Sequence, residues 1–130
     1  MIYDLLASST FLIVARLVLT SFFWIAGVVY LVKFRDMAGV IAAHGLPAPR
    51  LVTVMIAVTC LLGSALVITD FRSTGWLGAG ALGIFTFLSI PLGHPFWKFP
   101  QPRRMEEFQV ALEHIAVIGG LMCAAILTLR

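Results

Sequence analysis

Residues 51–69 read LVTVMIAVTCLLGSALVIT, a run of 19 residues that contains no charged side chain. A helix needs about 20 apolar residues to cross the hydrocarbon core of a bilayer. The run is continuously apolar, whereas the strands of a membrane β-barrel alternate apolar and polar residues. The stretch therefore predicts a membrane-spanning helix.

Three further stretches have the same character, at residues 10–31, 75–92 and 108–129. Together the four stretches predict an all-α integral membrane protein, in which residues 1–130 form a single domain that is a bundle of four transmembrane helices. We interpret the first stretch as a retained span rather than a signal peptide, because its apolar part is too long and no basic segment precedes it.

The composition supports a membrane location and excludes several other classes of protein. Hydrophobic residues make up 61% of the chain and charged residues 12%, whereas soluble domains are about half apolar and about a quarter charged. The excess of apolar surface predicts a lipid bilayer as the surrounding medium. Basic residues form no single cluster, which argues against a nucleic-acid partner. The sequence contains no phosphate loop, dinucleotide fingerprint or hydrolase motif and no four-ligand zinc pattern, so it identifies no catalytic residue and predicts no metal site.

Basic residues predict the orientation of the four spans. The first and third loops carry six of them, namely Lys33, Arg35, Arg50, Lys98, Arg103 and Arg104. The opposite side has only Arg72 and Arg130. Because cytoplasmic loops are enriched in Lys and Arg, we expect loops one and three to be cytoplasmic and both termini to lie outside.

The first loop contains a short amphipathic pattern. Its apolar and aromatic positions recur at helical spacing, at Met37, Val40, Ile41 and His44, and Gly45 follows them. This pattern predicts a short helix that lies in the membrane interface.

Small residues recur at four-residue spacing in the last two spans. They are Gly75, Ala79 and Gly83 in the third span, and Ala116, Gly120 and Ala124 in the fourth. Such residues allow helices to approach closely in lipid. They predict either close contacts inside one bundle or the interface of a homo-oligomer.

Ionisable residues inside spans are costly and are therefore candidates for function. Arg16 lies in the first span, and Asp70 ends the second span at the same predicted depth. One interpretation is an ion pair that joins these two spans. The alternative is a fixed cation that faces an anionic ligand or a quinone carbonyl.

A second polar group lies toward the cytoplasmic side. Glu113 and His114 are in the fourth span, and His94 closes the third span, followed by Trp97 at headgroup depth. Depth allows His94, Glu113 and His114 to share one pocket suited to proton exchange, although adjacent residues of a helix diverge by about 100°. The alternative is a hydrogen-bonded clamp between helices. A haem with two histidine ligands needs two imidazoles at matching depth on facing helices. His94 and His114 could meet this requirement, but the sequence does not favour haem.

Several short segments, taken in order, resemble the DoxX family over nearly the whole chain. They are ARLVL at 15–19, FFWIAG at 22–27, GLPAP at 45–49, HPFW at 94–97 and AVIGGL at 116–121, with Gly63 and Arg72 between them. Two positions depart from the family pattern. Thr59 and Cys60 stand where members often carry a glutamate, and His114 stands where many have asparagine.

The resemblance implies a small four-helix protein of the bacterial inner membrane. Some members are linked to quinone-dependent oxidoreductases, so our first hypothesis is a membrane subunit or anchor of a quinone-linked redox system, with a quinone or quinol as ligand and a redox enzyme as partner. The candidate site residues are Arg16, Asp70, His94, Trp97, Glu113 and His114. The alternative is a non-enzymatic scaffold or assembly factor, and a small-molecule transporter is a third hypothesis.

Overall fold

The structure is a computed structural model that describes residues 1–129. The described residues form α-helices and two short 3-10 turns, without a strand, which confirms the all-α prediction. In chain order these are α1 (Ile2–Leu6), α2 (Ser9–Val32), α3 (Phe34–Ala43), α4 (Pro49–Thr69), η1 (Phe71–Ser73), α5 (Gly75–Gly93), η2 (Phe96–Lys98) and α6 (Arg103–Thr128). Arg130, which was assigned to the outer side, lies outside the described residues.

Helices α2, α4, α5 and α6 are each long and apolar enough to cross a membrane. The first three begin and end within two residues of the predicted spans. Helix α6 begins at Arg103, five residues before the predicted start at 108. Residues 103–107 include four charged side chains, so apolarity does not reveal them. These residues form a polar first turn, and the apolar part of α6 follows it.

Local signals determine several helix ends. The Ser8 hydroxyl accepts a hydrogen bond of 3.1 Å from the backbone N–H of Phe11 and caps α2. Pro49 begins α4, where its fixed φ suits the first turn and its missing N–H costs nothing. Gly45 follows the end of α3 with a φ of +78°, a backbone conformation that glycine adopts without strain.

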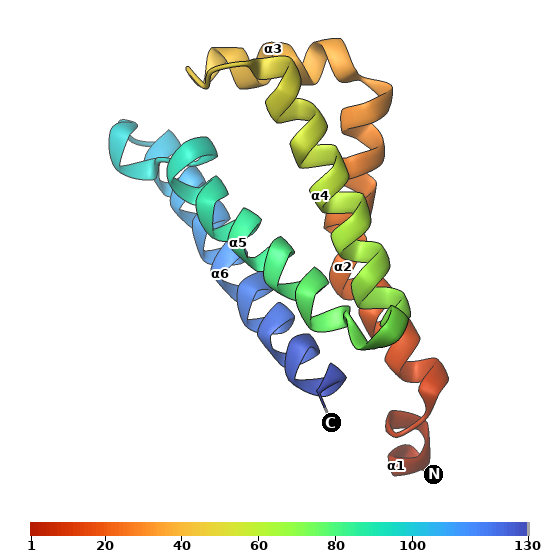
Figure 1. The fold of residues 1–130 in the computed structure, drawn as a ribbon. Coiled ribbons are helices and arrows are strands. Elements are labelled where there is room, and N and C mark those ends of the chain that lie inside the picture. The colour runs from red at the N-terminus through yellow and green to blue at the C-terminus, as the bar shows by residue number, and fades with distance from the viewer. Residues whose placement is uncertain (130) are drawn as a thin grey trace.

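The predicted helix of the first loop is confirmed as α3. It lies across one end of the bundle, with Ala38 and Ile41 buried and its other side exposed (Figure 1). It packs mainly against α4. The end of the bundle that carries α3 also carries η2, and the two described chain ends lie at the opposite end (Figure 1). We call these the α3 end and the α1 end.

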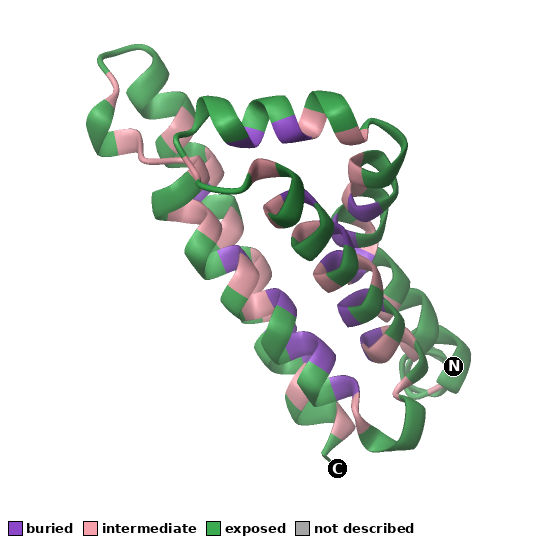
Figure 2. Ribbon diagram, turned by 45° about the horizontal axis from the view of Figure 1, so that its top comes forward, coloured by how far each residue is buried: buried purple, intermediate pink, exposed green. Residues whose placement is uncertain are grey.

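The four long helices pack in chain order. Helix α2 packs on α4, α4 on α5, and α5 on α6, while α2 and α6 touch in only a few places. The pair α2–α4 and the pair α5–α6 are close at the α1 end and diverge toward the α3 end (Figure 1). Buried residues form narrow stripes on the facing sides of the helices (Figure 2). The remaining apolar surface is exposed, as lipid contact requires.

Two glycines allow the closest helix contacts. A Cβ at Gly78 of α5 would lie 2.5 Å from the backbone oxygen of Gly63 in α4. A Cβ at Gly27 of α2 would lie 2.6 Å from Leu61 of α4. Both helix pairs therefore cross where a side chain is missing, which is the usual means of helix association in lipid.

The predicted small-residue faces are only partly inside the bundle. Ala79 and Ala124 are buried, and a Cβ at Gly120 would lie 2.9 Å from Leu19 of α2. These positions make contacts within one chain, as the first interpretation expected. Gly83 has open space around it and Ala116 is exposed, so these two positions take no part in that packing.

Candidate functional site

A hydrogen bond between two side chains joins the end of α5 to the start of α6. The Nδ1 atom of His94 lies 2.7 Å from Oε2 of Glu107. His94 follows the last residue of α5, and Glu107 lies in the second turn of α6. The Glu107 side chain is 18% exposed and that of His94 is 34% exposed. The contact is thus a partly buried, charge-assisted pair, which is stronger than a neutral hydrogen bond.

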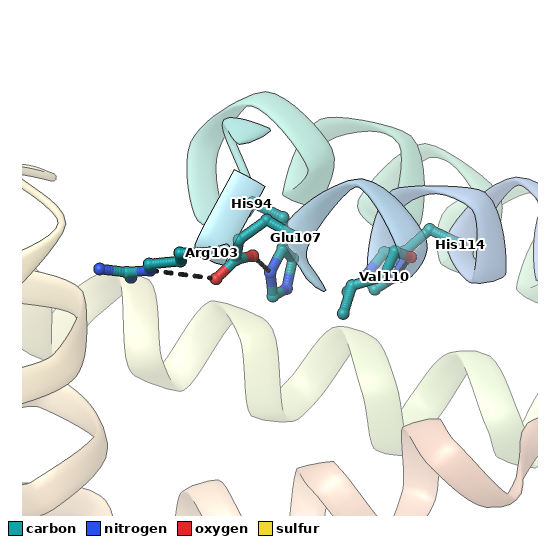
Figure 3. Close-up of polar contacts among 5 residues, drawn as sticks. All are labelled: His94, Arg103, Glu107, Val110 and His114. Atoms are coloured by element: carbon teal, nitrogen blue, oxygen red, sulfur yellow. Dashed lines mark hydrogen bonds and ion pairs between the residues drawn. The ribbon is translucent and has the colours of Figure 1, made fainter. Parts of the chain in front are cut away.

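Arg103 approaches the second oxygen of the same carboxylate. Its Nε atom is 3.7 Å from Oε1 of Glu107, one helical turn away. Its guanidinium also lies over the ring of Phe99, 3.9 Å from the centroid. Glu107 therefore sits between a cation and an imidazole (Figure 3). Contacts on both oxygens restrict the carboxylate to one orientation.

His114 lies two turns farther along α6 and faces His94. The two rings are 5.1 Å apart between centroids and meet edge to face. Nδ1 of His114 is 2.8 Å from the backbone oxygen of Val110, and Phe22 of α2 contacts the same ring, with 6.2 Å between centroids. A carbonyl oxygen only accepts hydrogen bonds, so Nδ1 of His114 carries the proton and donates.

These partners leave the same atom available on both imidazoles. Nδ1 of His94 can donate to the Glu107 carboxylate, and Nδ1 of His114 donates to Val110. In each neutral ring Nε2 then holds the lone pair. Either Nε2 can take up a proton and return it, with Glu107 compensating the charge on His94. The arrangement is suited to proton exchange with a bound molecule.

A cavity of about 510 Å³ lies at the same end of the bundle; Pro95 and Arg103 line it, whereas His94, Glu107 and His114 do not. It is lined by residues of α3 and the following loop on one side, and of α5, the third loop and the start of α6 on the other, namely Ala43, His44, Leu46, Pro91, Leu92, Pro95, Lys98, Phe99 and Arg103. Pro95 follows His94 directly, and Arg103 contacts Glu107. The lining combines apolar and aromatic groups with two cations, so it suits a flat polar ring that carries oxygen acceptors.

The structure brings together two of the predicted site residues, His94 and His114. Trp97 lies in η2, half exposed, where it contacts Phe96. Phe96 in turn packs on Phe108, with 5.0 Å between ring centroids. Trp97 is therefore at the edge of the site rather than in it.

Glu113 does not join the histidines, because it is exposed on the outer side of α6. Its place is taken by Glu107, which sequence analysis missed. The available signal was spacing, since Glu107 is seven residues before His114 and two helical turns return to the same face. Glu107 also lies before the predicted start of the span at residue 108, so it is not among the charges that the sequence places inside a span.

Arg16 and Asp70 are separate from the histidines and from each other. The predicted ion pair between them is not formed. Oδ1 of Asp70 instead accepts a hydrogen bond of 2.8 Å from the backbone N–H of Gly75. Asp70 thereby satisfies the first turn of α5, which explains why its carboxylate turns away from α2. The backbone oxygen of Arg16 accepts from the Thr20 hydroxyl at 2.7 Å, and its half-exposed side chain forms no ion pair in residues 1–129.

This contact predicts a structural role for Asp70. The Asp70→Ala variant is expected to lose about 1–3 kcal/mol of unfolding free energy, because it removes a helix cap and places alanine at a φ of +46°. Asp70→Asn is the matched control, since asparagine keeps the acceptor oxygen and tolerates this φ. Thermal unfolding in detergent measures both. Equal losses in the two variants would contradict the capping role.

The geometry of the site bears on metal and haem ligation. Among the described residues, no three His, Cys, Asp or Glu side chains are close enough to hold a metal ion. The rings of His94 and His114 are in direct contact, so a porphyrin cannot be inserted between them as they lie.

Comparison with known proteins identifies a family. The family model described as DoxX matches residues 11–95, which is more than half of the chain. The match includes His94 but ends before Glu107 and His114. Neither a search of curated proteins nor a search of solved structures finds a match.

Proposed function

The chain belongs to the DoxX family, and on that premise we propose that this multi-pass membrane protein is a small subunit of a quinone-linked redox system in the bacterial inner membrane. The proposal rests on the 2.7 Å contact between His94 and Glu107, together with a cavity at the same end of the bundle that is lined by the neighbouring Pro95 and Arg103. Electrons would come from a partner redox enzyme.

The chemistry of this contact fits a quinone headgroup. A quinone presents two carbonyl oxygens and needs a proton at each oxygen when it takes up two electrons. Protonated His94 would donate a hydrogen bond through Nε2 to one carbonyl, because its Nδ1 is already bound to Glu107. Glu107 at 2.7 Å and the His114 ring at 5.1 Å between centroids are the groups beside His94 that could exchange a proton with it.

The cavity would hold the ring of the quinone. Phe99, Leu92 and the prolines offer apolar contact, while Lys98 and Arg103 add positive potential near the carbonyl oxygens. Exposed apolar helix surface surrounds this end of the bundle. An isoprenoid tail would therefore extend from the cavity into lipid.

We further propose that the α3 end faces the cytoplasm. The six basic residues of loops one and three are at this end, and Arg72 is the one basic residue of the opposite loop within residues 1–129. This asymmetry supports the orientation through the preference of Lys and Arg for cytoplasmic loops. Protons for the site would then come from the cytoplasm.

Neighbouring glutamates test the proposal. Glu107→Gln keeps an acceptor for His94 but removes the charge, so quinone affinity is expected to fall about tenfold. Glu106→Gln makes the same change on an exposed residue one position earlier and is expected to leave affinity unchanged. Titration of a short-chain quinone into protein in nanodiscs measures both. Equal affinities of the two variants would contradict the proposed site.

A scaffold function is a second candidate, which the outer face of α6 favours. Glu113 is exposed there within a span and forms no ion pair in the described chain. Gly119 lies about 120° around the helix from Glu113, on a second exposed side where a Cβ would meet open space. A carboxylate that faces lipid is costly, so a protein partner that covers it would stabilise the membrane-embedded form.

The adjacent glycines Gly119 and Gly120 separate partner binding from folding. Gly119→Leu is expected to abolish recovery of a co-purified partner while thermal stability in detergent stays unchanged. Gly120→Leu is expected to lower stability, because its side chain would meet Leu19 at the contact of α2 with α6. Undiminished partner recovery with Gly119→Leu would exclude the Gly119 side of α6 as the scaffold surface.

A further inference from the structure

A second cavity lies between α3 and the first turn of α4. Its volume is about 390 Å³, and it is lined by Phe34, Arg35, Ala38 and Arg50. Three of these residues come from α3, and Arg50 is the second residue of α4. Ala38 is buried and Phe34 is half buried, while both arginines are exposed. The cavity thus has an apolar base and two guanidinium groups.

The positive charge of this cavity is not balanced by the protein. No carboxylate lines it, and neither Arg35 nor Arg50 forms an ion pair or a side-chain hydrogen bond among the described residues. Arg103, at the other cavity, contrasts with them because Glu107 accompanies it. Two like charges directed to one cavity repel each other unless an anion lies between them.

The start of α4 adds to the same potential. Helix α4 has no side-chain cap and no acidic residue in its first turn. Its first backbone N–H groups are therefore left without protein acceptors at the positive end of the helix dipole. The helix dipole therefore adds to the positive potential of the cavity, which comes mainly from the two arginines.

The position of the cavity indicates which kind of anion it would bind. Helix α3 begins two residues after α2 ends and lies across the end of the bundle (Figure 1). The cavity therefore opens where the spans leave the hydrocarbon core, at the depth of phospholipid phosphates. Guanidinium groups bind phosphate oxygens in pairs, and basic pockets beside transmembrane helices on the cytoplasmic side bind anionic lipid headgroups.

We propose that the cavity between α3 and α4 binds the phosphate headgroup of an anionic phospholipid through Arg35 and Arg50. Phe34 and Ala38 would contact the glycerol region, and the acyl chains would lie along the exposed apolar surface of the bundle. The lipid would hold α3 against the membrane at the α3 end. This inference concerns residues outside the histidine site and is independent of the quinone proposal.

Lipid retention by two double variants tests the inference. Phosphatidylglycerol is titrated into the detergent-solubilised protein, and retained lipid is counted by native mass spectrometry, with phosphatidylcholine as the zwitterionic comparison. Arg35→Gln combined with Arg50→Gln is expected to weaken phosphatidylglycerol retention about tenfold. Lys33→Gln combined with Arg104→Gln removes the same charge at the same end but outside the cavity, and is expected to retain the lipid as the wild type does.

Three results would contradict the proposed lipid site. Equal weakening in both double variants would show a general charge effect and overturn the assignment of the cavity. Equal retention of phosphatidylcholine by the wild type would exclude selection of an anionic headgroup. A third arm adds inorganic phosphate in excess, which is expected to leave the lipid bound. Complete displacement would indicate a site for free phosphate instead of a lipid.

Discussion

Replacement of His94 with alanine is expected to weaken quinone binding about 100-fold, the largest functional effect that the structure predicts. The variant removes the imidazole that would donate to the quinone carbonyl, and it leaves the Glu107 carboxylate partly buried without its closest partner. A hydrogen bond that involves a charged group contributes about 1.5–3 kcal/mol, which corresponds to about 10- to 150-fold in affinity, and the unpaired Glu107 places the expected loss toward the upper end.

The control for this variant lies on the same helix as Glu107. Gln109→Ala also removes a polar side chain, but Gln109 is exposed on the outer side of α6. Quinone titration in nanodiscs is expected to give wild-type affinity for this control. An affinity of His94→Ala within about twofold of the wild type would show that the imidazole does not contact the quinone.

Gly78→Ala is expected to produce the largest loss of stability for a single methyl group. The added Cβ would lie 2.5 Å from the backbone oxygen of Gly63 and 2.8 Å from Cβ of Leu66. Backbone cannot move as a flexible side chain does, so α4 and α5 must separate. Overpacking of this kind costs about 1–3 kcal/mol.

Gly80→Ala provides the matched comparison. Gly80 is on the same helix, two residues later, and a Cβ there meets nothing within 4 Å. Its unfolding free energy is expected to be unchanged or slightly higher, since alanine favours the helix more than glycine does. Unfolding in detergent by added denaturant measures both variants. Equal effects would contradict the close crossing of α4 and α5.

The spans could be predicted from sequence because lipid imposes a length and an apolar composition on each helix. The 19 uncharged residues at 51–69 are recovered within α4 with a two-residue extension at its start. The start of α6 could not be predicted in the same way. Residues 103–107 are polar and helical, and a criterion based on apolarity cannot distinguish a polar helical turn from a loop.

The sequence predicts how deep each candidate residue lies in the membrane, but not in which direction its side chain leaves the helix. His94 and His114 were expected at one level, and they meet. Glu113 was expected near them on depth alone, but its side chain leaves α6 about 100° away from that of His114. The contact of His94 with Glu107 depends on how the third loop returns the chain from α5 to α6, and no short-range pattern specifies that return.

Arg16 and Asp70 illustrate a second limit. Opposite charges at matching depth suggested an ion pair between α2 and α4, yet Asp70 binds the backbone N–H of Gly75. Asp70, with a φ of +46°, directly follows α4, and the turn η1 brings the start of α5 back to it. The carboxylate then has a nearer donor in Gly75 than in Arg16. A prediction that pairs charges by depth alone does not account for backbone N–H groups that compete for the same carboxylate.

The most direct test of the quinone site is photolabelling with an azidoquinone in native membranes, followed by identification of the labelled peptides. The proposed site predicts that the label falls on residues 43–46 or 91–107, which contain the cavity lining, and that an excess of unmodified quinone suppresses it. Labelling should fall strongly in the His94→Ala variant. A label confined to the α1 end, or one that unmodified quinone does not suppress, would contradict the proposed site.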